Sequence, residues 1–215
     1  MGREFSAFTI GEHFRILPEG TVPQQDERIE IIMAAGAFGS GEHETTASCL
    51  EILENHPDIK GARILDLGSG TGILSIAALK LGAKSALCVD IDPLAVATCQ
   101  RNCDINCVDS QVEHFCGTLD MIKEGNFDFV LANIYGDILI DVAKDLTAKA
   151  GDQAPLLLSG VLYEYNFDVR QAYKRLGFEE IKNFMLDEFS TVLLQKKIER
   201  KKNPHKSIIR RMTDT

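Results

Sequence analysis

From about residue 63 to residue 197, short apolar runs alternate with segments whose apolar residues recur every three or four positions. Runs such as "ARILDLG" and "SALCVDID" are typical of buried strands, and "GILSIAALKLG" is typical of a helix that ends at Gly82. Asp92-Pro93 predicts the next helix start, because Asp is a favoured N-cap and Pro a favoured first helical residue. The pattern predicts a parallel sheet with helices on both faces.

Further units of the same kind follow along the chain. They comprise "QVEHFC", "FDFVLANIY", a helix near 137–149, "APLLLSGVL" and the helix "EYNFDVRQAYKRLG". The last segment, "FEEIKNFMLDEFSTVLLQKK", contains two strands joined by a turn with no helix between them. Such a pair is antiparallel, so we expect a doubly wound, mostly parallel α/β sheet that ends in an antiparallel hairpin at one edge.

The residues before this series show a different pattern. Residues 5–33 resemble short strands broken by turns, and "RIEIIM" alternates weakly, as an edge strand does. A helix is expected from about Thr45 to Asn55, because Thr46, Cys49, Leu50 and Leu53 share one helical face.

Composition and charge narrow the class of protein. The chain has 215 residues, 45% apolar and 26% charged, with no run of 18 apolar residues and no apolar segment resembling a secretory signal. We therefore expect a cytoplasmic protein without membrane contact. The net charge is −9, but from Lys196 onward eight basic residues face two acidic ones. The acidic body argues against an extensive nucleic-acid surface. The basic tail suggests a contact with RNA or an acidic partner, or else a solvated terminus.

The six cysteines indicate free thiols in a reducing compartment. Cys99, Cys103 and Cys107 recur every four residues, which places them on one face of a helix. No Cys-x-x-Cys pair and no nearby histidine accompanies them, so small half-buried side chains are expected and no metal site is predicted.

Two glycine-rich loops stand close together. The first, "GAFGSGEHETTAS" at 36–48, lacks the Gly-Lys-Ser/Thr ending of a Walker-type loop. The second, "LDLGSGTG", has alternate glycines at 68, 70 and 72, so the third falls one residue early for a dinucleotide fingerprint. Asp90 ends the next strand, where an acidic side chain binds ribose hydroxyls in nucleoside-binding sheets. A purely structural strand-to-helix turn is the alternative.

"LDLGSGTG" followed by "VDID" resembles motifs I and II of class I S-adenosylmethionine-dependent methyltransferases. Together with "FGSGEHETT", "LANI" and "LLLSGVL", it resembles the bacterial methyltransferase family of ribosomal protein L-eleven. The resemblance implies a seven-stranded Rossmann-like sheet and methylation of lysine side chains and a terminal amine of a protein. It also implies linker strands over 1–35, a methyltransferase domain over 36–197 and a basic tail over 198–215, without the family's N-terminal recognition domain.

The resemblance also implies a set of site residues. The first loop would cover S-adenosylmethionine, whose product is S-adenosylhomocysteine, and the second loop would hold it from below. The expected cofactor-binding residues are Phe38, Thr46, Asp66, Gly68, Gly70, Gly72, Asp90, Ile91 and Asn133.

Three residues are the catalytic candidates. Asn133 and the carbonyl of Ile134 would grip the acceptor nitrogen, His43 would accept or relay its proton, and Tyr135 would line the acceptor slot. The alternatives are an N-cap at Thr45 or Thr46 with His43 as a loop donor, and surface packing for Tyr135. At the level of function, the alternatives are methylation of a small molecule or RNA, and an inactive cofactor-binding module.

Overall fold

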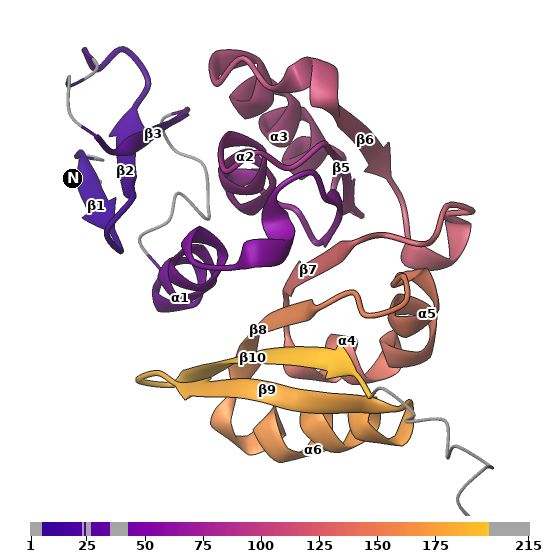
Figure 1. Cartoon of the computed structure of the whole chain (residues 1–215). Coiled ribbons are helices and arrows are strands. Elements are labelled where there is room, and N and C mark those ends of the chain that lie inside the picture. The colour runs from indigo at the N-terminus through magenta and orange to yellow at the C-terminus, as the bar shows by residue number, and fades with distance from the viewer. Residues whose placement is uncertain (1–5, 23, 25–26, 35–42, 198–215) are drawn as a thin grey trace, which may run out of the picture.

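The computed structural model describes residues 6–22, 24, 27–34 and 43–197, which form a three-stranded and a seven-stranded sheet with helices (Figure 1). The strands are β1 (Phe8–Ile10), β2 (Phe14–Pro18), β3 (Ile29–Met33), β4 (Arg63–Leu67), β5 (Ser85–Asp90), β6 (Val112–Cys116), β7 (Phe129–Asn133), β8 (Leu156–Leu162), β9 (Phe178–Met185) and β10 (Phe189–Lys196). The helices are α1 (Glu44–Glu54), α2 (Ile73–Lys80), α3 (Pro93–Ile105), α4 (Gly136–Asp141), α5 (Ala143–Lys149) and α6 (Tyr163–Arg175). Short 3₁₀ turns cover Pro57–Ile59, Asp109–Gln111 and Leu119–Met121.

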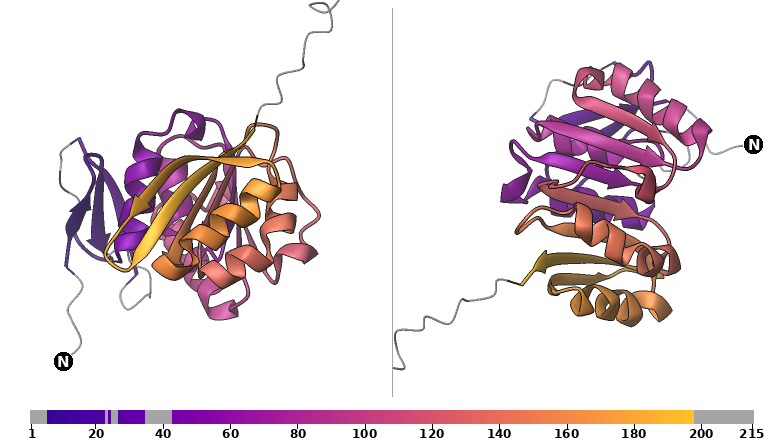
Figure 2. Two further views of the ribbon diagram at one scale, coloured as in Figure 1. Left: turned by 90° about the horizontal axis from the view of Figure 1, so that it is seen from below. Right: turned by 90° about the vertical axis from the view of Figure 1, so that its right-hand side faces the viewer.

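The large sheet has the strand order β6-β5-β4-β7-β8-β10-β9. Strands β4 to β8 pair in parallel, and β10 is antiparallel to both of its neighbours, β8 and β9. The predicted doubly wound sheet with an antiparallel C-terminal hairpin is therefore confirmed. The last strand lies inside the sheet and β9 forms the edge, as the yellow and orange strands of Figure 2 show.

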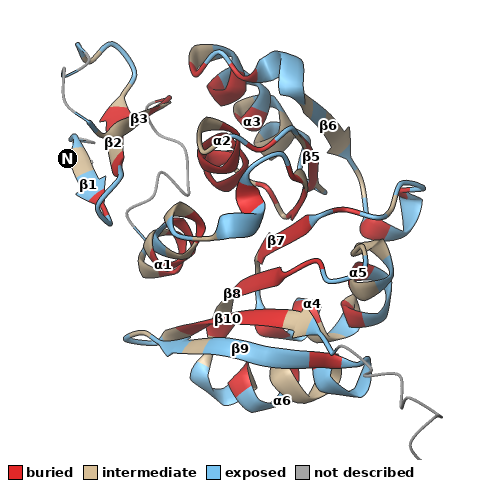
Figure 3. Ribbon diagram, viewed as in Figure 1, coloured by how far each residue is buried: buried red, intermediate tan, exposed pale blue. Residues whose placement is uncertain are grey.

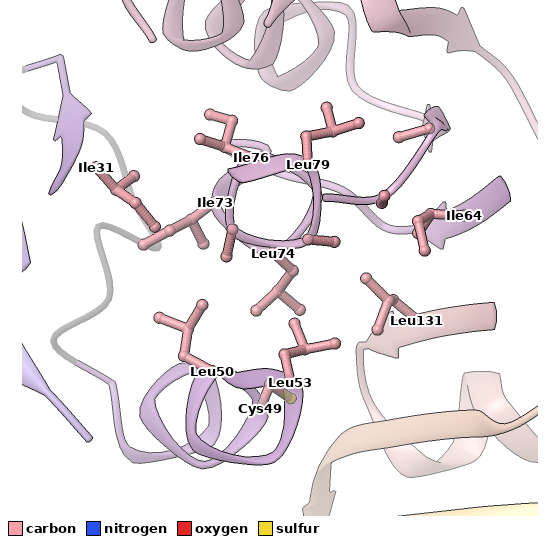
Figure 4. Packing of buried hydrophobic residues seen from close by; sticks show 14 of the residues in the cluster. Ile31, Cys49, Leu50, Leu53, Ile64, Ile73, Leu74, Ile76, Leu79 and Leu131 are labelled. Carbon is pink, nitrogen blue, oxygen red and sulfur yellow. The ribbon is translucent and has the colours of Figure 1, made fainter. Parts of the chain in front are cut away.

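Helices cover both faces of this sheet because successive strand residues point to opposite sides. In β4, Ile64 belongs to a core cluster with residues of α1, α2 and α3, whereas Leu65 belongs to a second cluster with residues of α4, α5 and α6. The central strands are buried on both faces (Figure 3). Figure 4 shows the first cluster, in which Leu50 and Leu53 of α1 lie beneath Leu74 of α2.

The three N-terminal strands pack onto this first cluster. β1 is antiparallel to β2, and β2 is parallel to β3. Ile31 of β3 lies in the cluster beside Ile73 of α2 (Figure 4). Asn102 of α3 donates to the carbonyl of Thr71 and accepts from the amide of Ala34, so this sheet is tied to the loop after β4. The division at residue 35 stays a prediction, and the tail over 198–215 lies outside the described residues.

Two details differ from the sequence expectation. The helix expected near 137–149 is two helices, because Val142 ends α4 and begins α5 with a ψ of 0°. Cys99 and Cys103 are fully buried, whereas Cys107 is exposed beyond the helix with a φ of 58°. Among the described residues, no helix is both long and apolar enough to cross a lipid bilayer.

Candidate active site

The loop after β4 brings three glycines into the left-handed region. Gly68, Gly70 and Gly72 have φ values of 69°, 53° and 78°. A Cβ at Gly68 would lie 2.3 Å from the Cγ2 atom of Ile134, and one at Gly72 would lie 2.4 Å from the Sγ atom of Cys99. At Gly70 the space is open, with the carbonyl oxygen of Gly68 4.0 Å away. The alternation of glycines therefore makes a bare backbone turn that opens at Gly70.

Asp90, the last residue of β5, holds this turn. Its Oδ2 atom accepts from the amide of Gly70 at 2.9 Å, and its Oδ1 atom accepts from the amide of Asp92 at 3.0 Å. Asp92 itself caps α3 by accepting from the amide of Leu94 at 2.9 Å, as its spacing from Pro93 predicted. The Asp90 carboxylate thus stands at the rim of the loop, with further lone pairs on each oxygen.

Asp66 lies beneath the loop and is buried. Its Oδ2 atom accepts from the hydroxyl of Ser75 at 2.7 Å. Burial raises the pKa of the Asp66 carboxyl to about 6, although the hydrogen bonds of Ser75 oppose this and the nearby Asp90 adds to it. Burial is the main cause because it penalises the charged form of the carboxyl.

A raised pKa makes Asp66 a source of pH-dependent stability. The protonated carboxyl stabilises the fold below about pH 3.8, and this contribution is lost as the pH rises through about 6. A shift of roughly two pKa units corresponds to about 3 kcal/mol. Asp66→Asn keeps an acceptor for Ser75 but cannot ionise, so we expect it to flatten this part of the pH profile. Between pH 4 and 7 the unfolding free energy of the wild type should fall relative to that of the variant.

Urea denaturation across this pH range measures the difference. The exposed Asp120→Asn is the matched control, because it removes the same charge from the surface. A wild type and an Asp66→Asn variant with parallel pH profiles would show that Asp66 has an ordinary pKa.

The next strand end carries the acceptor candidates. Asn133 ends β7 and Ile134 follows it, and both lie against Gly160 of β8, whose φ is 77°. A Cβ at Gly160 would lie 2.7 Å from the carbonyl oxygen of Ile134 and 3.1 Å from the Oδ1 atom of Asn133. Two hydrogen-bond acceptors therefore lie on one side of the same residue. The side-chain nitrogen of Asn133, Nδ2, donates to the hydroxyl of Thr46 in a long hydrogen bond of 3.4 Å.

Helix α1 places Thr46 at this edge, and His43 caps the helix. The Nδ1 atom of His43 accepts from the amide of Thr45 at 3.4 Å and lies 2.8 Å from the Thr45 hydroxyl. The alternative of a threonine N-cap is therefore wrong, because the residue with extended backbone before the helix is His43. The ring stands edge-on to Phe189 at 5.1 Å. While Nδ1 accepts from Thr45, the neutral ring carries its proton on Nε2; Nε2 is free to accept a proton only in the other tautomer, in which Nδ1 donates to the Thr45 hydroxyl.

A buried hydroxyl network supports α1 against β8 and β10. The Ser159 hydroxyl lies 2.6 Å from that of Thr191 and 3.4 Å from the carbonyl of Thr45. These residues and Gly160 were not predicted from the sequence. A glycine inside the apolar run "LLLSGVL" was the available signal, because glycine in a strand marks a close approach of backbone.

Glu44, the first residue of α1, was also missed. Its carboxylate accepts from three successive amides of the β9–β10 turn, those of Asp187, Glu188 and Phe189, at 3.0, 3.2 and 3.2 Å. Burial opposes the effect, but these bonds hold the pKa of Glu44 below its usual 4.5. Glu44 therefore anchors the start of α1 to the C-terminal hairpin.

We expect Glu44→Gln to lower the unfolding free energy at pH 7 by about 1–2 kcal/mol, because an amide has one acceptor oxygen and presents donors to donors. A lowered pKa stabilises the fold above pH 4.5, and this contribution is lost as the pH falls below that value. The difference between wild type and variant should therefore shrink on acidification. Urea melts at pH 7 and pH 3.5 measure this, with the exposed Glu51→Gln as control. An equal loss for both variants would contradict the anchoring role.

The remaining predicted residues are placed as follows. Phe38 lies outside the described residues. Ile91 and Tyr135 are 74% and 66% exposed, so neither is packed into the core. The predicted roles of these residues stay predictions.

The site candidates lie at the same end of the large sheet, where the parallel strands have their carboxyl ends. Asp66, Asp90, Asn133 and Gly160 lie at or near the carboxyl ends of β4, β5, β7 and β8, which are neighbours in the strand order. After β4, the next two strands are added on one side of it (β5, β6), and the following two on the other side (β7, β8). Open α/β sheets bind ligands at such a switch point, which here lies between β4 and β7. A surface hollow beside Arg63, Lys84 and Gln111 lies at the opposite end, beside the amino ends of the strands.

Comparisons with known proteins identify the family of the chain. The profile of the family described as "Ribosomal protein L11 methyltransferase (PrmA)" matches residues 2–197. A protein named ribosomal protein L11 methyltransferase from Geobacter sulfurreducens is 41% identical over 179 residues, which are 81% of this chain and 58% of the relative. One of the same name from Exiguobacterium sp. is 32% identical over 189 residues, or 87% of this chain and 60% of the relative.

A crystal structure of a ribosomal protein L11 methylase from Lactobacillus delbrueckii subsp. bulgaricus superposes with a TM-score of 0.82 and 26% identity. It covers 90% of this chain and 100% of that chain. The present chain spans less than two thirds of the length of the two curated relatives. The profile match and the levels of identity place the chain in the ribosomal protein L11 methyltransferase family.

Proposed function

We propose that the chain is an S-adenosylmethionine-dependent N-methyltransferase that acts on protein amines, with ribosomal protein L11 as the first candidate substrate. One observation carries the proposal. The glycine turn with Asp90, and the pair of acceptors from Asn133 and Ile134, meet at adjoining strand ends. The names of the relatives supply the candidate substrate.

The residues after β4 and β5 fit such a cofactor. The turn at Gly70 has no side chain and open space above it, so a ligand can approach the backbone. Asp90 offers a carboxylate at the rim, suited to a ribose diol, and the exposed Ile91 beside it offers an apolar surface to a base. When bound, S-adenosylmethionine supplies a methyl group already activated by a positively charged sulfur.

The acceptor pair favours an amine over a hydroxyl. A neutral primary amine donates two hydrogen bonds and keeps one lone pair for attack, whereas a hydroxyl has a single proton to donate. The Oδ1 atom of Asn133 and the carbonyl oxygen of Ile134 are both acceptors, and both lie close to Gly160. Such orientation is worth on the order of 7–11 kcal/mol in well-ordered cases.

The amine must also be neutral. A lysine amine has a pKa near ~10.4 in water, and partial burial lowers that pKa by disfavouring the ammonium form. His43 is our candidate to accept the proton, through Nε2 in the tautomer in which Nδ1 donates to the Thr45 hydroxyl. The exposed side chains of Tyr135 and Ile138 follow the acceptor pair in the chain, and the exposed Tyr163 follows Gly160; we propose that they offer an apolar surface to a polypeptide. The basic tail is a further candidate contact to an acidic partner or RNA.

A labelling experiment tests the proposal. The purified chain is mixed with methyl-tritiated S-adenosylmethionine and either ribosomal protein L11 or lysate from cells that lack this protein. We expect label in protein, recovered as methylated lysine or terminal amine after hydrolysis. Label confined to RNA or small molecules would contradict a protein substrate. Tight binding of S-adenosylhomocysteine without any labelled acceptor would indicate an inactive binding module.

Asn133→Ala tests the acceptor grip in the same assay. We expect turnover to fall by about 10–100-fold while the affinity for S-adenosylhomocysteine stays within about twofold, because a lost hydrogen bond of this kind is worth about 1.5–3 kcal/mol. Asn55→Ala, at the far end of α1, is the control and should keep full turnover. If Asn133→Ala lost cofactor affinity alone, Asn133 would belong to the cofactor site.

A further inference from the structure

Three potential metal ligands meet under helix α3, outside the candidate active site, and a fourth lies beside them. Cys88 of β5 and His114 of β6 are directly opposite each other in the parallel register of these strands. Their side chains therefore share one face of the sheet, and Cys99 and Cys103 of α3 lie one turn apart on the helix that packs over it. The expectation that no histidine lies near the cysteines is wrong, because sheet pairing brings His114 to them.

The distances suit a metal site. The Sγ atoms of Cys88 and Cys99 and a ring nitrogen of His114 all lie within 4.8 Å of one another. Metal–sulfur bonds of about 2.3 Å and metal–nitrogen bonds of about 2.0–2.1 Å place tetrahedral ligands about 3.5–3.8 Å apart. The three atoms therefore need to approach one another by at most about 1.3 Å to bind one ion. The Cys103 thiol contacts Cys99 and His114 but does not belong to the group of mutually close atoms, so its side chain must turn towards the other three to become a fourth ligand.

The burial of these side chains and the state of the His114 ring also favour a metal site. Cys88, Cys99 and Cys103 are at most 1% exposed, and the Nδ1 atom of His114 is buried without a well-formed hydrogen bond to any described residue. A buried polar atom left in this state is costly, and a metal ion would satisfy it. β6 is the edge strand and His114 is half-buried, so an ion can enter from that edge.

We propose that Cys88, Cys99 and His114 bind a zinc-type divalent cation, with Cys103 turning in as the fourth ligand of a closed tetrahedral site that braces the cofactor loop. Three thiolates and an imidazole favour zinc over magnesium or calcium, which prefer oxygen ligands. The link to the loop is direct, because the Sγ atom of Cys99 fills the space where a side chain at Gly72 would lie. As a thiol, Cys88 also donates to Ser75, which donates to Asp66 beneath the same loop; as a metal-bound thiolate it would give up that hydrogen bond but still lie beside Ser75.

Metal analysis and cobalt binding test this site without relying on enzymatic activity. The full chain is purified without a polyhistidine tag and under reducing conditions, and its zinc content is measured by mass spectrometry. Metal-free protein is then titrated with Co²⁺. We expect about one zinc per chain, and a thiolate-to-cobalt charge-transfer band with the intense visible bands of tetrahedral Co²⁺. Substoichiometric zinc together with no cobalt bands in the wild type would overturn the proposal.

Variants locate the ion. His114→Gln changes a half-buried edge position that tolerates polar side chains, and it should lower the Co²⁺ affinity at least about tenfold. Cys99→Ser should remove part of the charge-transfer intensity. The exposed Cys107→Ser and Cys116→Ser are matched controls and should bind Co²⁺ like the wild type. Unchanged binding by both His114→Gln and Cys99→Ser, or loss of binding in either control, would show that the ion lies elsewhere.

Discussion

Gly160→Ala is expected to lower turnover by at least about 100-fold, although Gly160 has no side chain that could bind the substrate or transfer a proton. The new Cβ would lie 2.7 Å from the carbonyl oxygen of Ile134 and 3.1 Å from the Oδ1 atom of Asn133. The Ile134 carbonyl is backbone and cannot yield as the end of a side chain does, so this segment must shift, and the Asn133 side chain must shift with it. A misplacement of an ångström at a reacting centre costs about 100-fold in rate. The φ of 77° adds strain of about 1–2 kcal/mol to the fold.

Gly177→Ala separates the two effects. Gly177 has a φ of 88°, but a Cβ there would meet no atom within 4 Å. This variant should therefore lose stability by about 1–2 kcal/mol and keep its turnover. Turnover is measured with saturating S-adenosylmethionine, and stability is measured by urea denaturation. If Gly160→Ala kept its turnover, or if Gly177→Ala lost as much, Asn133 and Ile134 would not hold the acceptor.

What could be predicted from the sequence was local in origin. The alternation of apolar runs and amphipathic segments is set by neighbours a few residues apart, so strands, helices and the final hairpin could be predicted. The glycine turn was predictable for the same reason, because glycine at alternate positions allows the left-handed backbone seen at Gly68, Gly70 and Gly72. Asp90 followed from its place at the end of the next strand.

What could not be predicted depends on residues far apart in the chain. Glu44 has no local signature, because its three partners lie 143 to 145 residues away. The insertion of β10 between β8 and β9 is likewise invisible to a periodicity argument. His114 faces Cys88 only because β5 and β6 pair in one particular register. In each case the sheet order had to be known before the side chains could be brought together.

Asp90→Asn is expected to weaken binding of S-adenosylhomocysteine by about 10–150-fold. In the wild type each carboxylate oxygen accepts one backbone hydrogen bond, from Gly70 or from Asp92, and keeps a lone pair for a ribose hydroxyl. An amide has one acceptor oxygen, so its NH₂ group would face either the Gly70 amide or the Asp92 amide. The loop bond and the diol contact are then both weakened, which corresponds to about 1.5–3 kcal/mol for bonds to a charged group.

Asp92→Asn provides a control with the same charge change two residues away. Asp92 caps α3 through the amide of Leu94, and asparagine caps a helix about as well as aspartate. We therefore expect its cofactor affinity to stay within about twofold of the wild type. Calorimetric titration of both variants decides between the two causes. Equal losses of affinity in the two variants would mean that the ligand responds to the general negative potential near the loop. A loss confined to Asp90→Asn would mean that a carboxylate is needed at position 90 itself, where it binds both the Gly70 amide and the ribose.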